Sequence, residues 1–218
     1  MPTVLFDFDS TLIRCESLEE ICAEYLDDDT RRDISLITQA GMEGKISFAE
    51  SLSMRLKLAQ PTKTAIEKFT ANPELYLTHG MKDLIKSLST RCDIWVISGG
   101  LVDVIYPFAE AVNIPRERVR GITGRWDGEI FHLKKSDPFV SGKIEGCQAL
   151  VRHWKSPTLA VGDGITDFAL YQEGLVNHFL PYTEHVTRDF VKTEKLTPIR
   201  NVYELKSAID SILEAATS

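Results

Sequence analysis

The sequence predicts an α/β protein with a mostly parallel sheet, a helical insertion and a small β-hairpin. From residue 79 onward, apolar segments of strand length alternate with segments of helix length, as in parallel sheets that are covered by helices. Residues 14–75 contain helix patterns and no strand candidate, which is too long for a loop and indicates an inserted helical unit. The pair Asp127-Gly128 lies between two β-prone segments and is a hairpin signal.

The composition is that of an ordinary globular protein, with 218 residues, 43% of them apolar and 26% charged. The longest apolar runs have strand length, so we expect no membrane partner, and the start of the chain lacks the basic region of a signal peptide. The cysteines form no CxxC pair and no zinc spacing. The formal net charge of −7 disfavours nucleic acid as a partner. We therefore expect a cytoplasmic protein.

The first expected element is an apolar strand that ends at two acids, Asp7 and Asp9. Because side chains alternate along a strand, both carboxylates are expected on the same side. Four helices should follow, over residues 17–26, 33–41 and 47–59 and from residue 64 onward. Ser-x-x-Glu capping boxes at Ser17 and Ser47 predict the start of the first and the third. The charged residues 27–32 are interpreted as a break between helices.

The elements beyond residue 79 follow the same reasoning. Helices are expected over residues 81–88, 101–112, 142–154 and 202–216 and after residue 167, and strands over 94–98, 118–123, 129–133, 158–162 and 176–180. The strands 118–123 and 129–133 flank the Asp-Gly turn and should form the hairpin. Since ligands of open parallel sheets bind beyond the carboxyl ends of the strands, polar residues at those ends are candidate site residues.

Polar residues follow three of the predicted strands. They are Asp7 and Asp9, then Ser98, Gly99 and Gly100, then Asp163 and Asp167, with Lys143 near the start of the helix before the last group. Four carboxylates in one crevice repel each other unless cations relieve them. A hard divalent ion with oxygen ligands, above all Mg²⁺, meets that need. The hydroxyl of Ser98 and the amides of the two glycines, at a helix N-terminus, offer donors to an anion.

Each group has a structural alternative. Asp7 and Asp9 could cap the end of a strand, and Gly99-Gly100 could form only a tight βα turn. Lys143 could be a solvated lysine of a helix. Asp163 could belong to a turn, and Asp167 could be an acid in the first turn of a helix. The joint order DxD, SGG, Lys and GDGxxD, each at the corresponding end of its element, favours a chemical site over these alternatives.

These four groups resemble the four motifs of the haloacid dehalogenase superfamily. The resembling residues are Asp7-Phe8-Asp9-Ser10-Thr11, Ser98-Gly99-Gly100, Lys143 and Gly162-Asp163-Gly164-Ile165-Thr166-Asp167. Within the superfamily the chain is most similar to members that hydrolyse phosphoserine, on residues 9–13 followed by Glu16 and on the stretch from Gly41 to Leu56. One departure is Thr166, where many relatives have Asn, and the segment from 177 to 198 matches less well.

The resemblance implies a Rossmann-like doubly wound core, formed by residues 1–13 and 76–218, and a helical cap formed by residues 14–75. It also implies a Mg²⁺-dependent phosphomonoesterase that works through an aspartyl-phosphate and converts L-phosphoserine to L-serine and phosphate, a step of serine biosynthesis. Another small phosphomonoester, such as phosphothreonine or phosphohomoserine, is the alternative substrate. The expected partner is thus a small molecule, and the chain is expected to be a monomer or a homodimer.

The resemblance assigns catalytic roles. Asp7 would be the nucleophile, Asp9 the general acid and base, and Mg²⁺ would be held by Asp7, Asp163 and the backbone carbonyl of Asp9. The phosphate would be bound by Ser98, Gly99, Gly100 and Lys143. Asp167 would hold metal-bound water or orient Lys143 as a residue behind the ligands.

The resemblance also assigns a substrate pocket, formed by Glu16, Met42, Phe48, Arg55 and Thr166. Arg55 would bind the substrate carboxylate, a task suited to guanidinium, and Glu16 would bind the ammonium. A helix from Ser47 places Arg55 on an apolar stripe. Without the resemblance, Arg55 can be explained as an arginine whose stem packs while its head reaches water. Glu16 can be explained as an acid that is favoured just before a helix.

Two other classes of protein compete with this hypothesis. A phosphorylated receiver-like regulatory domain also uses an acidic pocket, a phosphorylated Asp, Mg²⁺ and a Lys. It lacks the second Asp and the helical cap, and Asp9 favours turnover because it provides a base to discharge the intermediate. A purely structural α/β domain leaves the clustered acids unexplained.

Overall fold

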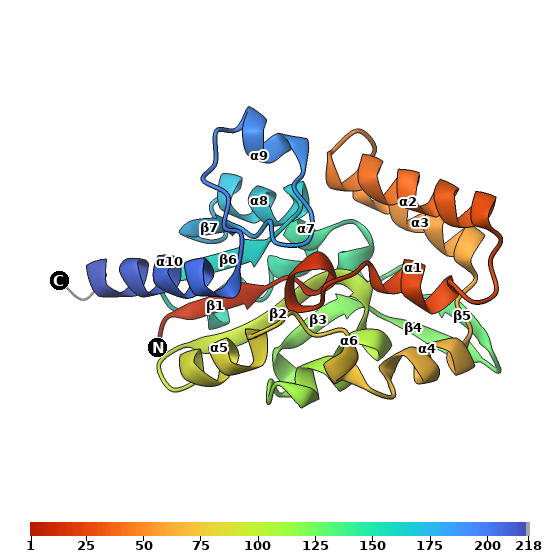
Figure 1. The fold of residues 1–218 in the computed structure, drawn as a ribbon, viewed down its shortest axis with the longest axis horizontal. Coiled ribbons are helices and arrows are strands. Elements are labelled where there is room, and N and C mark those ends of the chain that lie inside the picture. The colour runs from red at the N-terminus through yellow and green to blue at the C-terminus, as the bar shows by residue number, and fades with distance from the viewer. Residues whose placement is uncertain (217–218) are drawn as a thin grey trace.

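A five-stranded parallel sheet organises the chain, which the computed structural model describes over residues 1–216 (Figure 1). The strand order is β3-β2-β1-β6-β7, so β1 is central and the chain leaves it first toward one edge and later toward the other. The bounds are β1 Thr3–Phe6, β2 Asp93–Leu101, β3 Val119–Ile122, β6 Thr158–Gly162 and β7 His178–Pro181. This doubly wound arrangement confirms the predicted fold class.

The register of the sheet brings three strand ends together. All residues of β1 and of β6 are buried, which explains why these strands are continuous apolar runs without alternation. Phe6 lies opposite Val96 of β2 and Val161 of β6. Asp7 directly follows Phe6, and Ser98 and Asp163 lie two residues beyond Val96 and Val161. The three residues therefore lie at the same end of the sheet.

The helices of the core pack around this sheet. Their bounds are α5 Met81–Leu88, α6 Val102–Ala111, α7 Lys143–Cys147, α8 Ile165–Gln172, α9 Asp189–Thr193 and α10 Val202–Ala215. Short 3₁₀ turns occur at Pro73–Leu75, Arg116–Arg118, Pro138–Val140 and Val151–His153. Helix α6 packs on β2 and β3, and α8 packs on β6 and β7. Both contacts bury apolar side chains against the apolar strands.

Four helices connect β1 to α5. They are α1 Ser17–Cys22, α2 Asp28–Met42, α3 Phe48–Ala59 and α4 Lys63–Thr70. Figure 1 shows this helical segment on the side toward which β1 points, with α2 and α3 lying side by side. The carboxyl ends of the sheet strands therefore face the helical segment.

One predicted helix start and one predicted cap were wrong, although α1 begins at Ser17 as expected. Helix α2 begins at Asp28, within the predicted charged break, since the side chain of Asp27 accepts a hydrogen bond from the Thr30 amide at 2.7 Å. Ser17 does not cap α1. Its backbone amide instead donates to Oδ1 of Asp9 at 2.7 Å, so Asp9 is tied to the start of α1.

Three other boundaries also differ from the prediction. The strand expected at 118–123 is β3, which pairs with β2 in the main sheet, and the hairpin is formed by β4 Gly124–Asp127 and β5 Ile130–Leu133. Strand β2, which was expected to end at residue 98, continues to Leu101 through an irregular register with β3. Helix α7 ends at Cys147, well before the predicted end.

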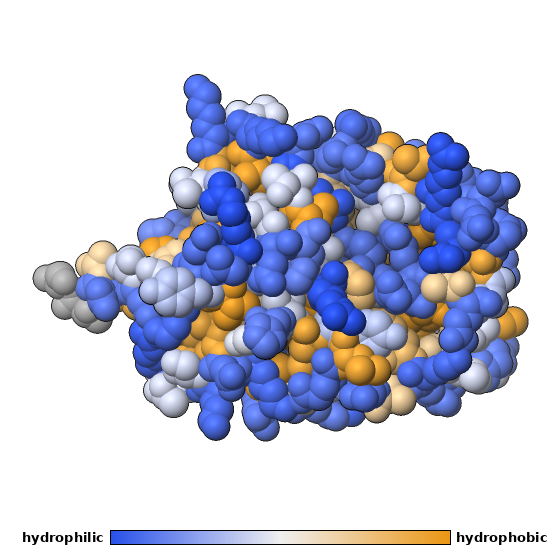
Figure 2. All heavy atoms as spheres, in the orientation of Figure 1, coloured by the Kyte–Doolittle hydropathy of each residue, from blue (hydrophilic) through white to orange (hydrophobic). Residues whose placement is uncertain are grey.

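The surface in Figure 2 is covered mainly by hydrophilic residues, with hydrophobic residues scattered between them. Among the helices of residues 1–216, none has the length and apolar character needed to cross a membrane.

Candidate active site

One cavity beyond the strand ends is lined by most of the predicted site residues. They are Asp7, Asp9, Glu16, Met42, Phe48, Arg55, Ser98, Gly99, Gly100, Lys143 and Thr166. Asp163 and Asp167 are buried beside Asp7. The structure thus brings together residues from β1, the helical segment, β2, α7 and the turn after β6.

The chain turns sharply after β1. Residues Phe8–Leu12 form a single π-type turn, and Ser10 has a φ of 52°, in the left-handed region. Oδ1 of Asp7 accepts a hydrogen bond from the Phe8 amide at 2.7 Å. The prediction that strand alternation aligns Asp7 and Asp9 was wrong, because both residues follow the strand. The turn brings both carboxylates to the cavity.

Asp7, Asp163 and Asp167 form an acidic cluster in which carboxylate oxygens lie within 4.8 Å of one another. Lys143 Nζ lies 2.7 Å from Oδ1 of Asp7 and 2.5 Å from Oδ1 of Asp167. Arg188 holds Oδ2 of Asp163. Within residues 1–216, Oδ1 of Asp163 and Oδ2 of Asp167 are buried without a hydrogen-bond partner. Unpaired buried carboxylate oxygens are unfavourable, and the donor set therefore fits a hard divalent cation.

Burial controls ionisation in this cluster. It raises the pKa of Asp163 to about 7, against the opposing effect of Arg188, and it raises the pKa of Asp167 well above the ordinary value, with Asp7 adding to the effect. Burial alone would lower the pKa of Lys143, but Asp167 and Asp7 raise it above its usual range. A bound cation would favour the charged carboxylates.

Close packing at this site depends on Gly162. A Cβ atom on this residue would lie 2.3 Å from Cγ of Asp167. Glycine is therefore required for the last residue of β6 to approach the Asp167 carboxylate, which in turn accepts a hydrogen bond from Lys143.

Asp9 lies outside the cluster of Asp7, Asp163 and Asp167. Its Oδ1 accepts from the Ser17 amide at 2.7 Å, and burial, with further effects of Glu16 and Asp7, raises its pKa to about 8. A carboxyl group with that pKa is mostly protonated at neutral pH. The cavity therefore contains a proton donor beside the acidic cluster.

Strand β2 ends in a short polar segment. Ser98 is buried, and its Oγ accepts a hydrogen bond from the Gly100 amide at 2.9 Å. These glycines belong to β2 and not to a helix N-terminus, so that part of the prediction was wrong, and the Gly100 amide is already engaged. A Cβ at Gly99 would lie 2.5 Å from the ring of Phe48, so glycine allows α3 to pack closely on the strand end.

Sequence comparison identifies the family of this arrangement. The family model described as haloacid dehalogenase-like hydrolase matches residues 4–172, which include all four motifs.

The chain belongs to the haloacid dehalogenase-like hydrolases.

Individual members of this family are similar over most of the chain. It is 28% identical over 214 residues to the phosphoserine phosphatase of Rattus norvegicus, an alignment covering 95% of this chain and 92% of the relative. It is 29% identical over 194 residues to the chloroplastic phosphoserine phosphatase of Arabidopsis thaliana, covering 86% of this chain but only 65% of that longer protein. The crystal structure of a phosphoserine phosphohydrolase-like protein from Francisella tularensis superposes with a TM-score of 0.91 at 39% identity, covering 96% of this chain and 100% of the other.

Arg55 lines the cavity in this haloacid dehalogenase-like hydrolase. The residue is 9% exposed, and its Nε has no hydrogen-bond partner within residues 1–216. It lies on α3, on the same buried face as Leu52 and Ala59, which agrees with the predicted stripe. A buried guanidinium nitrogen without a partner in a cavity is an unused donor for an anion.

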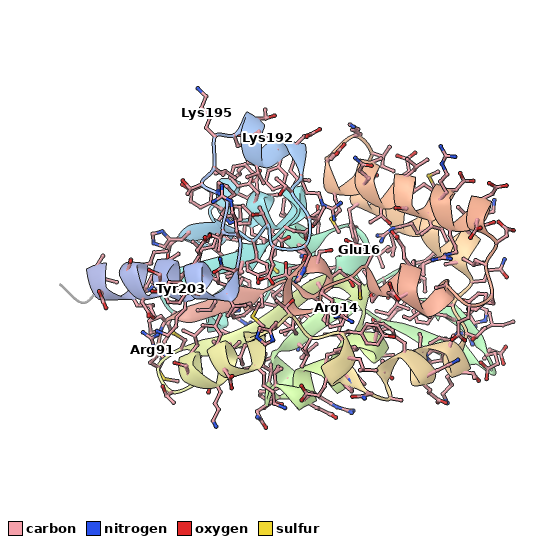
Figure 3. The ribbon with its side chains drawn as sticks, viewed as in Figure 1. Arg14, Glu16, Arg91, Lys192, Lys195 and Tyr203 are labelled. Carbon is pink, nitrogen blue, oxygen red and sulfur yellow. The ribbon has the colours of Figure 1, made fainter. Side chains whose placement is uncertain are left out.

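Glu16 lies between the sheet and the helical segment, next to the labelled Arg14 in Figure 3. Its Oε1 accepts hydrogen bonds from Oγ of Ser10 and from Nη2 of Arg188, both at 2.9 Å. The carboxylate is therefore already paired with a guanidinium within the chain.

Sequence reasoning did not assign Arg188, Glu19 or Thr38 to the site. Arg188 reaches it from the segment that matches the family motifs less well. Glu19 and Thr38 also line the cavity, and burial together with Glu16 raises the pKa of Glu19. For Glu19 the spacing from Glu16 along α1 was an available signal, whereas no local pattern singles out Arg188.

Proposed function

We propose that this hydrolase is a Mg²⁺-dependent phosphatase that converts L-phosphoserine to L-serine and phosphate. The observation that carries the proposal is the buried, unpaired Nε of Arg55 in the same cavity as Asp7 and Asp9. A small phosphomonoester with a carboxylate would meet the acidic cluster with its phosphate and Arg55 with its carboxylate. The names of the relatives support the same substrate.

In the proposed reaction an oxygen of Asp7 attacks phosphorus, so that an Asp7–phosphorus bond forms and the bond between phosphorus and the serine oxygen breaks. Asp9 gives its proton to the departing serine oxygen. Asp9 then takes a proton from water, whose oxygen attacks the phosphorus of the aspartyl-phosphate. Phosphate leaves, and Asp7 returns as a carboxylate while Asp9 is again protonated.

The surrounding residues would prepare this reaction. Lys143 would place positive charge beside the attacking carboxylate and the phosphate, and the hydroxyl of Ser98 would donate a hydrogen bond to the phosphate. Mg²⁺ would be held by Asp7, Asp163 and the backbone carbonyl of Asp9, and Asp167 would orient Lys143. When bound, the ion supplies charge that offsets the repulsion between a carboxylate and a phosphate dianion.

The helical segment would exclude water from the reaction. We take residues 14–75 as a cap over a core of residues 1–13 and 76–218. Phe48 supports this reading because it is the residue of α3 that packs against Gly99 at the strand end, and a closing element over the phosphate protects an intermediate from premature hydrolysis.

Replacing Arg55 tests the substrate assignment. Arg55→Ala is expected to lower kcat/KM for L-phosphoserine at least tenfold, because a hydrogen bond to a charged group contributes about 1.5–3 kcal/mol. It should largely spare an aryl phosphate, which has no carboxylate. Lys57→Ala, on the exposed face of the same helix, is the control and should change neither substrate. A parallel decline for both substrates with Arg55→Ala would mean that another phosphomonoester is hydrolysed.

The pKa of Asp9 predicts a pH dependence. Because that pKa is raised to about 8, Asp9 keeps its proton below that pH and loses it above. Proton donation to the serine oxygen should then fail, so kcat for L-phosphoserine falls as the pH rises through about 8. An aryl phosphate should be less affected, because a phenolate leaves without protonation. Profiles for both substrates check this, and two coincident profiles would contradict the role of Asp9.

A further inference from the structure

Arg188 lies in the site without a role in the proposed mechanism. It is 7% exposed, and its guanidinium makes contacts in two directions. Nε and Nη2 lie 2.9 and 2.8 Å from the same oxygen, Oδ2 of Asp163. Nη2 also donates to Oε1 of Glu16 at 2.9 Å, across 172 residues of sequence. One side chain thus joins the turn after β6 to the residue that precedes α1.

The backbone around Arg188 is fixed by apolar packing. Phe190 and Val191, which follow it in α9, are buried in a small cluster with Phe168 of α8. The rings of Phe168 and Phe190 lie 5.8 Å apart. Helix α8 begins directly after the Asp163-Gly164 turn. The position of Arg188 relative to Asp163 is therefore set by the contact between α8 and α9.

The contacts of Asp163 are unequal. Nε and Nη2 of Arg188 bind Oδ2, whereas Oδ1 is buried without a hydrogen-bond partner within residues 1–216. Asp163 contributes a carboxylate oxygen to the cluster with Asp7 and Asp167, and Oδ1 is the oxygen that Arg188 leaves unpaired. A carboxylate held by one oxygen presents the other in a defined direction. Groups behind metal ligands commonly act in this way.

We propose that Arg188 is a positioning residue, which holds Oδ2 of Asp163 so that Oδ1 is presented to the cation and which ties this ligand to Glu16 on the substrate side. The inference rests on the proposed function, because it takes Asp163 as a ligand of the divalent ion.

The charge of Arg188 and its contacts with Asp163 are expected to have opposite direct effects on the affinity for the metal ion. A guanidinium next to a cation site repels the cation, so loss of the charge alone would strengthen metal binding. Loss of orientation would weaken it, typically by about 10- to 100-fold for residues behind a ligand. Loss of the guanidinium also removes a charge that favours the ionised form of Asp163, so Arg188→Lys, which keeps the charge, is the variant that separates orientation from charge.

The test is the affinity for Mn²⁺, measured without substrate from the free-ion EPR signal. Arg188→Met is expected to bind Mn²⁺ about 10- to 100-fold more weakly than the wild type. Arg188→Lys, which keeps the charge but not the paired nitrogens, should also bind more weakly. Lys192→Met removes the same charge from an exposed position of α9, shown in Figure 3, and should bind like the wild type. Equal or tighter binding by Arg188→Met would overturn the inference.

Two further measurements keep the outcome decisive. Thermal unfolding identifies variants that do not fold, and if Arg188→Met is among them, Arg188→Lys decides by the same criterion. Asp163→Asn tests the metal site itself. If the wild type binds no Mn²⁺, or Asp163→Asn binds it as the wild type does, the metal site of the proposed function fails. If Asp163→Asn loses binding while the Arg188 variants keep it, only the positioning role fails.

Discussion

Asp7→Asn is expected to abolish turnover of L-phosphoserine and of an aryl phosphate alike. An amide of the same shape cannot attack phosphorus, and the residue cannot be replaced by another acid because Asp163 and Asp167 are held by Arg188 and Lys143. The fold should survive, because the amide oxygen can still accept from the Phe8 amide as Oδ1 does now. The measurement is phosphate release at saturating substrate, with thermal unfolding as the check on folding.

Asp93→Asn is the matched control for this variant. Asp93 begins β2, at the opposite end of the sheet, where it pairs with Arg118 at 2.9 Å. This substitution should leave kcat unchanged. Near-normal activity of Asp7→Asn would rule out an aspartyl-phosphate on this residue.

Asp9→Asn is expected to lower kcat for L-phosphoserine by about 10²–10⁴-fold, the range typical of lost general acid–base catalysis. The asparagine can still accept from the Ser17 amide, so the start of α1 should be retained. The variant cannot protonate the serine oxygen or activate water.

For the Asp9→Asn variant, comparing the two substrates separates the formation of the aspartyl-phosphate from its hydrolysis. With an aryl phosphate the first step needs no acid, so only the hydrolysis of the intermediate should be slow. The steady-state kcat with both substrates and the amplitude of the initial burst show which of the two steps the substitution slows. A loss smaller than tenfold with L-phosphoserine would contradict the assignment of Asp9.

Local sequence patterns predicted the sheet and most of the site. Apolar runs marked the strands, and the groups Asp7, Ser98 and Asp163 could be placed at one edge because parallel strands end together. Arg55 could be placed on an apolar stripe because Phe48, Leu52 and Ala59 recur at helical spacing around it. These features depend on residues that are close in sequence or on rules common to all parallel sheets.

The remaining features depend on contacts between distant segments. The cap of α1 by Asp9 and the pairing of Arg188 with Asp163 and Glu16 join residues that no short window contains. The turn after β1 places a non-glycine residue, Ser10, at positive φ, which propensity disfavours and which only the surrounding structure can enforce. Patterns within short windows of sequence do not reveal such long-range contacts or the backbone conformation that they enforce.

The central claim is that the phosphoryl group passes through Asp7, and the Asp9→Asn variant tests it most directly. The variant is mixed with Mg²⁺ and an aryl phosphate, quenched in acid within the burst, digested and analysed by mass spectrometry. We expect phenolate release equivalent to the enzyme present and a phosphoryl group on the peptide that contains Asp7. Phosphate release without a phosphorylated peptide, or phosphorylation of a different residue, would contradict the account.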